Sequence, residues 1–138
     1  MHLKLITHDR VVFDEDVDEI YTKGVDGEFG ILKGHIPMMS ALDVGVTKVV
    51  QGNRTRLFTT MGGIFQFKED NAIILTDLAE DGSDIDVARA KAAKERAEAR
   101  LSDRKAEFDA QRAESALARA KARLKVALNN EKKSNKFI

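Results

Sequence analysis

The stretch that decides the fold of the first part of the chain reads Leu-Asp-Val-Gly-Val-Thr-Lys-Val-Val over residues 42–50. Its apolar residues 42, 44, 46 and 50 fall on one face at a period of two, which is typical of a β-strand with one buried side. The turn sequence Gln-Gly-Asn follows at 51–53, and Arg-Thr-Arg-Leu-Phe-Thr-Thr at 54–60 predicts a returning strand. These residues predict a β-hairpin.

Short strand patterns continue on both sides of this hairpin. The further candidates are residues 3–7, 11–13, 17–23, 64–68 and 72–76. We expect Gly62-Gly63 to break the chain, and we interpret the glycine-rich segment 24–30 as a turn around Asp26-Gly27. At least seven short strands in the first 82 residues predict a β-sandwich or flattened barrel.

The composition changes abruptly at Gly82. All nine glycines and the single proline lie in residues 1–82, which carry 8 basic and 14 acidic side chains, a net charge of −6. Residues 83–138 carry 15 basic and 9 acidic side chains, a net charge of +6, and are rich in helix-forming residues. We therefore predict an α+β protein with a sandwich domain at 1–82 and an antiparallel α-helical hairpin at 83–138.

Two apolar stripes at three- and four-residue spacing predict the two helices. We expect Ser83 and Asp86 to form a capping box for the first helix, a break at Ser102-Asp103, and Asp109 as the cap of the second helix. The stripe residues are Val87, Ala90, Ala93, Ala97 and Leu101, then Ala113, Leu117, Ala120, Leu124 and Leu128.

Most residues of these stripes are alanines, which bury little apolar area. The helices should therefore be stable while their docking is marginal, so that a ligand or partner could decide their position. An ordinary static hairpin is the alternative, and composition alone leaves both interpretations open.

Several functional classes are excluded by what the chain lacks. It has no cysteine, which excludes a disulfide framework and a thiol nucleophile, and no apolar run near the roughly 20 residues that span a bilayer. The start of the chain lacks the apolar core of a secretory signal, so we expect a soluble cytoplasmic protein. The three histidines are scattered without a catalytic motif, and segment 24–30 lacks the Gly-Lys-Ser/Thr ending of a phosphate loop. We predict a protein that is not an enzyme and holds no metal.

The arginines of the second part are the strongest chemical signal. Arg89 and Arg96 share a face of the first helix, and Arg119 and Arg123 share a face of the second. If these faces meet, four guanidinium groups converge and need an anion such as phosphate between them. A solvated helix surface with scattered salt bridges is the alternative.

Three motifs carry a family resemblance. They are Gly-Glu-Phe-Gly-Ile-Leu-Lys-Gly-His-Ile-Pro at 27–37 with Ala41-Leu42 and Gly45 after it, Met-Gly-Gly-Ile-Phe at 61–65, and Ile-Asp-Val-Ala-Arg-Ala at 85–90. In this order and spacing the chain resembles the ε subunit of bacterial F-type ATP synthases over essentially its whole length. Lys33 departs from the pattern, because many relatives have proline there.

The resemblance implies a rotary function. The sandwich would dock on the γ subunit and the rotor ring through a contact loop that includes Glu28 and His35, on the cytoplasmic face of the cell membrane and without inserting into it. The hairpin would be a movable brake on ATP hydrolysis. In its extended state the second helix would contact acidic loops of the catalytic β subunits through Arg112, Arg119, Lys121, Arg123 and Lys125, and the net charge of +6 agrees with such a contact.

The resemblance also implies a regulatory nucleotide, although no cofactor is required. Some members of the family bind ATP when the hairpin is folded down, and the corresponding residues here are Glu80, Asp86, Arg89, Arg96, Arg119 and Arg123. Two other classes remain as alternatives. A free-standing β-barrel with a basic tail could bind nucleic acid, although Tyr21 is the only tyrosine and tryptophan is absent. A passive coiled-coil adaptor would not need the arginine set.

Overall fold

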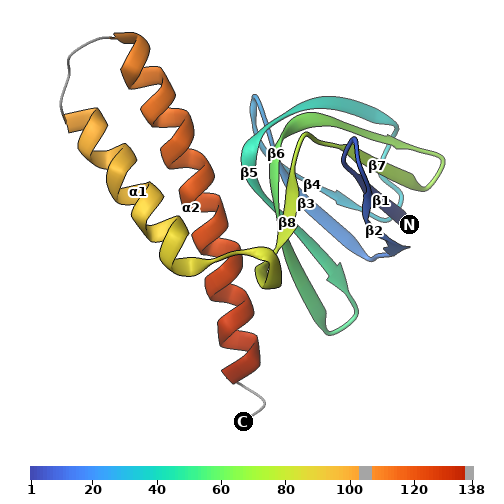
Figure 1. The fold of residues 1–138 in the computed structure, drawn as a ribbon. Coiled ribbons are helices and arrows are strands. Elements are labelled where there is room, and N and C mark those ends of the chain that lie inside the picture. Colours follow the sequence, from blue (N-terminus) through green and yellow to red (C-terminus); the bar gives the residue numbers. More distant parts are fainter. Residues whose placement is uncertain (103–106, 136–138) are drawn as a thin grey trace.

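The computed structural model describes residues 1–102 and 107–135, which form eight strands and two long helices (Figure 1). The strands are β1 His2–Ile6, β2 Val11–Asp16, β3 Glu19–Gly24, β4 Gly27–Leu32, β5 Met38–Gln51, β6 Arg54–Lys68, β7 Asn71–Leu75 and β8 Ala79–Asp81. The one-turn 3-10 helix η1, Gly82–Asp84, leads to α1, Val87–Ser102, and α2, Glu107–Asn135. The predicted α+β fold class is confirmed.

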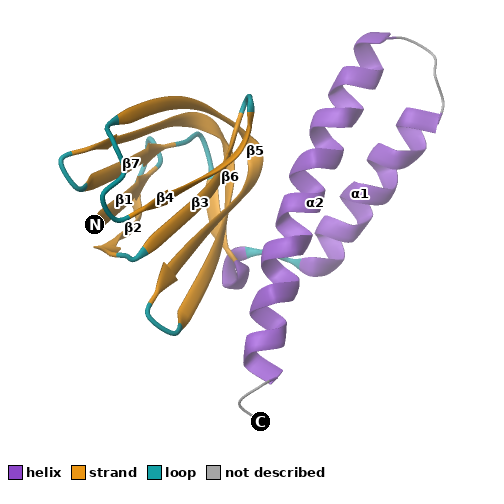
Figure 2. Ribbon diagram, turned by 180° about the vertical axis from the view of Figure 1, so that it is seen from behind, coloured by secondary structure: helices purple, strands orange, loops and turns teal. Residues whose placement is uncertain are grey.

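The strands form one sheet in the order β2-β1-β7-β6-β5-β3-β4, with β8 paired to β6. Neighbouring strands are antiparallel except β1 and β7, which run parallel. The long strands β5 and β6 bend, so that the sheet folds back over itself and encloses a core (Figure 2). This arrangement is the predicted sandwich.

We expected Gly62-Gly63 to break the chain, and this prediction is wrong. Both glycines lie inside the continuous 15-residue strand β6. Both have positive φ, +76° and +113°, and a Cβ on Gly63 would lie 2.0 Å from the backbone oxygen of Leu75. Before the glycines Phe58 points into the core, and after them Phe65 and Phe67 do. The glycines therefore form the bend at which β6 changes the side that faces the core, as strands do at the corners of sandwiches.

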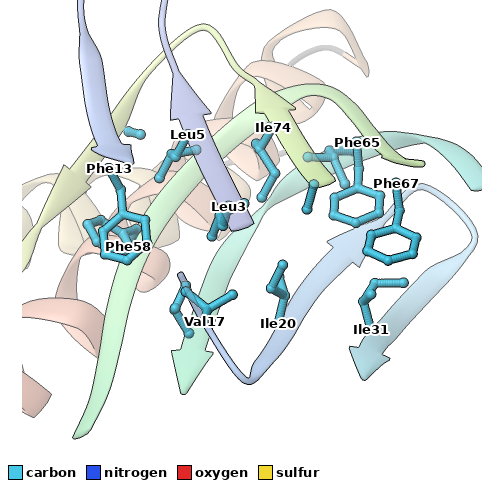
Figure 3. Close-up of a cluster of buried hydrophobic side chains, with 14 residues drawn as sticks. Leu3, Leu5, Phe13, Val17, Ile20, Ile31, Phe58, Phe65, Phe67 and Ile74 are labelled. Atoms are coloured by element: carbon cyan, nitrogen blue, oxygen red, sulfur yellow. The ribbon is translucent and has the colours of Figure 1, made fainter. Parts of the chain in front are cut away.

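The core lies entirely in the sandwich, where aromatic and branched side chains from opposite parts of the sheet interdigitate (Figure 3). Two edge-to-face ring pairs, Phe13 with Phe58 and Phe29 with Phe65, have centroids 5.5 Å and 5.3 Å apart. The buried cluster is Leu3, Leu5, Phe13, Val17, Ile20, Ile31, Leu42, Val49, Phe58, Phe65, Phe67, Ala72, Ile74 and Ala79. Because none of the helix residues whose side chains the structure describes belongs to this cluster, we expect the sandwich to fold without the hairpin.

The two helices run antiparallel, and α2 lies between α1 and the sandwich in both views (Figures 1 and 2). Of the predicted stripe, Ala90, Ala97, Ala113 and Ala120 are buried, as expected for a seam. Leu128 is 41% exposed, so its assignment to the seam is wrong. Ala127 beside it is 1% exposed and continues the seven-residue spacing of Ala113 and Ala120, so the seam passes through position 127 instead.

The side of α2 that faces the sandwich is also poor in large side chains. Ala122 and Val126 are buried there, and α2 packs against β5, β6, β8 and η1. On β5, Val44 and Val46 are half-buried and line the groove beside Ala122. They therefore do not share a single core-facing side with Leu42, as the period of two had predicted, because β5 also bends. A small apolar area holds the hairpin down.

Candidate functional site

Glu80 connects the sandwich to the hairpin. It lies on the short strand β8, where its backbone N–H donates to Thr59 Oγ1 of β6 at 3.0 Å and its Oε1 accepts from that hydroxyl at 3.4 Å. The Nε–H of Arg123 on α2 donates to the same Oε1 at 2.9 Å. The side chains of Glu80 and Arg123 are 18% and 30% exposed, so this charge-assisted hydrogen bond is partly shielded from water.

Asp86 begins α1. Its Oδ1 accepts from the backbone N–H of Arg89 at 3.1 Å, and its carbonyl accepts from Ala90 at 3.0 Å, which is the geometry of an N-cap. The predicted Ser83–Asp86 capping box is therefore wrong. The capping box present belongs to η1 and joins Asp81 to Asp84. Asp109 is not a cap either, because α2 begins two residues earlier, and Asp103 lies outside the described residues.

Three arginines stand directly before seam alanines: Arg89 before Ala90, Arg96 before Ala97 and Arg119 before Ala120. Each residue turns a helix by 100°, and in an antiparallel pair the position before a seam residue lies on the same flank of both helices. These three arginines therefore share one flank of the hairpin. Arg123 lies one turn after Arg119 on that side.

The charges on this flank are unevenly compensated. Within residues 1–102 and 110–129, whose side chains the structure describes, no ion pair involves Arg89, Arg96 or Arg119. Arg89 and Arg96 are exposed, whereas Arg119 and Arg123 are half-buried. Guanidinium groups on one flank of the hairpin, beside one paired glutamate, are suited to an anion with several oxygens, because each planar fork can bind two of them.

The remaining predicted cations lie elsewhere on α2. Arg112, Lys121 and Lys125 are exposed. Lys121 and Lys125 line the groove that α2 forms with the sandwich, together with Glu28 and Glu114. Arg123 is turned to Glu80, so in this conformation it is not available to a partner. The five residues predicted to inhibit therefore do not form one surface while the hairpin is folded down.

The predicted contact loop is only partly a loop. His35 lies in the segment between β4 and β5, its Nδ1–H donating to the Ile36 carbonyl at 2.7 Å and its ring edge-to-face with Phe67. Glu28 is exposed but lies within strand β4, which corrects its placement in a turn. The alternation of inward Phe29 and Ile31 is the signal that identifies β4, whereas the glycines around it are typical of a turn.

The sequence interpretation missed an exposed apolar surface on the outer side of β5, β6 and β7, which we call the apolar face. The strand register places Ile64 opposite Leu75, with Ile73 and Met39 both opposite Gln66. Their exposed fractions run from 41% for Ile73 to 67% for Met39. Contiguous exposed apolar side chains commonly mark an interaction surface. The alternation of Ile73 and Leu75 with buried Ala72 and Ile74 was the available signal.

Two further classes of site are absent from the part of the chain that the structure describes. No group of three or more histidine, cysteine, aspartate or glutamate side chains has a metal-binding arrangement there. Within the same residues, neither helix has the length and apolar character needed to cross a membrane.

Comparison with known proteins identifies the architecture. Residues 1–82 match the family model for the ATP synthase delta/epsilon chain β-sandwich domain, and residues 83–127 match the model for its long α-helix domain. The chain is 46% identical over 99 residues to the ATP synthase epsilon chain of Anoxybacillus flavithermus, covering 72% of this chain and 74% of that one. It is 44% identical over 105 residues to that of Desulforamulus reducens, covering 76% and 80%.

Solved structures agree with these relatives. A chain of the Euglena gracilis mitochondrial ATP synthase, in a structure of its OSCP, F1 and c-ring, superposes with a TM-score of 0.78 at 26% identity over 91% of this chain and 79% of that one. A central-stalk and c-ring structure from Tetrahymena thermophila shares the fold, with a TM-score of 0.59 at 14% identity over 91% and 95%. The chain belongs to the delta/epsilon family of ATP synthase subunits. It is a subunit of the central stalk of the epsilon type, and it is not catalytic.

Proposed function

We propose that the sandwich docks on the γ subunit through the apolar face and couples the rotor ring to the catalytic head. The apolar face is the largest group of exposed apolar side chains that shares one side of neighbouring strands, and Ile36 in the adjacent loop is 74% exposed. Glu28 and His35 would contact the rotor ring from the β4 edge and the loop after it. In this position the subunit would lie peripherally, on the cytoplasmic face of the cell membrane.

The docking proposal has a matched pair of variants. Ile73→Asp places a charge in the apolar face and should prevent binding to the γ subunit without unfolding the sandwich, because the side chain is 41% exposed. Val11→Asp is the control, since Val11 is 51% exposed on edge strand β2, outside that face. Co-purification with the γ subunit measures the effect, and equal binding by both variants would exclude the apolar face as the docking surface.

The hairpin is proposed to be a movable brake on ATP hydrolysis. In the folded-down conformation α2 rests on the sandwich through small side chains and the Glu80–Arg123 pair, so little interaction has to be lost for release. Once released, the basic residues Arg112, Arg119, Lys121, Arg123 and Lys125 would become available together to acidic loops of the catalytic β subunits. Complementary charge favours both the encounter and its register.

ATP is the proposed ligand of the folded-down state. The observation that carries this proposal is the shared flank of Arg89, Arg96 and Arg119 without ion pairs, beside the Glu80–Arg123 pair. Asp86, at the start of α1, contributes a carboxylate that can accept from the amine of a base or from a ribose hydroxyl. ATP would then stabilise the hairpin against the sandwich as any ligand stabilises the state it binds. The proposed role is sensing rather than hydrolysis, because the sequence contains neither a phosphate loop nor a catalytic motif.

Removal of residues 85–138 tests the brake. The cut leaves the core cluster and the Asp81–Asp84 capping box intact, so the shortened chain should fold and bind the stalk. Hydrolysis by the reconstituted complex should rise or lose its initial lag. Unchanged hydrolysis in a complex that contains the shortened subunit would refute the brake.

No feature of the sandwich favours the nucleic-acid alternative, since its prominent surface is apolar.

A further inference from the structure

The side chain of Arg56 lies between the core of the sandwich and the start of the hairpin connection, and it has no role in the proposed function. Its guanidinium carbon lies 5.2 Å from the ring centroid of Phe13 and 5.1 Å from that of Phe58, both of which belong to the core. A planar guanidinium stacks favourably on aromatic rings. The two rings are themselves packed edge-to-face, so the core fixes where the head of Arg56 lies.

From this position Arg56 contacts carboxylates of two different parts of the chain. One terminal nitrogen lies 3.5 Å from Glu15 of β2, and the other lies 3.7 Å from Asp81, at the end of β8. Glu15 belongs to the sandwich, whereas Asp81 begins the connection to the hairpin. The guanidinium group of Arg56 therefore links residues 81–84, which lead to the hairpin, with the sandwich. The side chain of Arg56 is only 31% exposed.

Asp81 holds the connection in a closed turn. Its Oδ1 accepts from the backbone N–H of Ser83 at 2.7 Å and from the Ser83 hydroxyl at 2.6 Å, while its own N–H donates to Asp84 Oδ2 at 3.3 Å. Burial opposes ionisation of Asp81, but the hydrogen bonds from Ser83 and the charge of Arg56 outweigh it and lower the pKa of the carboxyl. Asp84 lies 3.8 Å from Arg10 of the β1–β2 turn, which adds a second link to the sandwich.

A single residue separates this turn from the hairpin. Asp84 belongs to the capping box of η1, and Asp86 caps α1. Ile85, between them, is the C-cap of η1; it is extended at φ −106° and ψ 126° and makes none of the capping hydrogen bonds of η1 or α1. A rotation of the hairpin at Ile85 breaks no capping hydrogen bond, whereas a rotation within residues 81–84 breaks several.

We propose that Arg56 is a clasp that fixes residues 81–84 to the sandwich, so that the hairpin turns about Ile85. Rotation about Ile85 rests on the hairpin movement proposed above. The attachment of residues 81–84 by Arg56 does not depend on that movement. A fixed pivot limits the volume that a released α2 can search, compared with a flexible connection of six or seven residues. The clasp would thereby determine which residues of a released α2 can contact a partner at a given distance from the sandwich.

Amide hydrogen exchange and 15N relaxation of the full chain test the clasp. In the wild type, the Ser83 amide should be protected and residues 81–84 should have order parameters like those of the sandwich. Arg56→Met keeps an apolar stem against the rings but removes both ion pairs, and should speed Ser83 exchange at least tenfold. Arg54→Met is the matched control, because Arg54 lies two residues earlier on the same side of β6 and is exposed. It should leave Ser83 unchanged.

A second variant protects the test against unfolding. Asp81→Asn keeps an oxygen that accepts from Ser83 but removes the charge that binds Arg56, and should increase the mobility of residues 81–84 less than Arg56→Met does. Unchanged amide signals of core residues such as Phe65 would show that each variant is folded. Slow Ser83 exchange in folded Arg56→Met, or fast exchange in the wild type, would overturn the clasp.

The pivot is tested by releasing the hairpin. The chain has no cysteine, so spin labels on Lys68→Cys and Lys91→Cys, both exposed, report the distance from sandwich to α1. In an Arg123→Ala background this distance should broaden while Ser83 stays protected. Loss of Ser83 protection together with the broadening would place the pivot before Asp84 and overturn the proposal. An unchanged distance between the labels would contradict both rotation about Ile85 and the proposed brake. The exchange rate of the Ser83 amide would still test whether Arg56 fixes residues 81–84.

Discussion

Removal of the Glu80 carboxylate should loosen the hairpin without unfolding the sandwich. A hydrogen bond to a charged group contributes about 1.5–3 kcal/mol, and partial exposure of this pair reduces the value to about 1–2 kcal/mol. The remaining contact of α2 with the sandwich is made largely by small side chains, among them the buried Ala122 and Val126. Glu80→Ala should therefore raise the ratio of released to docked hairpin by roughly 5- to 30-fold.

A single thiol measures this ratio. Ala122 is 5% exposed on the side of α2 that faces the sheet, so the thiol of Ala122→Cys should react with a soluble reagent only when the hairpin leaves the sheet. Its labelling rate should rise roughly 5- to 30-fold in Glu80→Ala, in proportion to the released fraction. Glu80→Gln should give an intermediate rise, because the amide oxygen still accepts from Arg123 but carries no charge.

The matched control is a thiol in the sandwich core. Ala72 is 1% exposed and belongs to the core cluster, so labelling of Ala72→Cys should not change when Glu80 is replaced. A parallel rise at both thiols would show global unfolding rather than release. An unchanged rate at Ala122→Cys would refute the conclusion that the Glu80–Arg123 pair holds the hairpin down.

Three further outcomes are expected. Gly63→Ala should destabilise the sandwich by more than about 2 kcal/mol in a denaturant titration, because its φ of +113° and a Cβ 2.0 Å from a backbone oxygen are both unfavourable. Hydrogen bonds to Asp14 and then Asp16 raise the pKa of His2 above 6.5, so the stability it adds relative to His2→Gln should be complete below about pH 6.5 and decline as the pH rises through the raised pKa. ATP should raise the melting temperature, AMP should raise it less, and Arg89→Ala should remove most of the gain whereas Lys125→Ala keeps it; equal shifts in both variants would exclude the arginine flank.

The sequence predicted what depends on local pattern. Residues 42–60 form the expected pair of strands, and the change at Gly82 separates strands from helices as the composition indicated. The errors arose where a local signal has two structural meanings. A pair of glycines marks a turn or a bend within a strand, and at Gly62-Gly63 only the pairing of β6 with β5 and β7 decides between them.

Contacts between distant segments could not be predicted in the same way. Arg56 meets Glu15 and Asp81, which are 41 and 25 positions away, and nothing in the residues beside it indicates either partner. The same holds for Arg123 and Glu80, whose pairing depends on how α2 lies on the sheet. In contrast, the shared flank of Arg89, Arg96 and Arg119 follows from helical spacing once the seam alanines are known.

Arg123 links the two proposed states of the hairpin, because it cannot serve both at once. While its Nε–H donates to Glu80, its charge is held against the sandwich and is withheld from any acidic loop of a catalytic subunit. Arg119 is subject to the same competition if ATP occupies the flank. Each contact that stabilises the folded-down hairpin therefore also removes a cation from the proposed inhibitory surface. A ligand of the folded-down state would relieve inhibition twice, by shifting the position of the helices and by neutralising the side chains that the extended state needs.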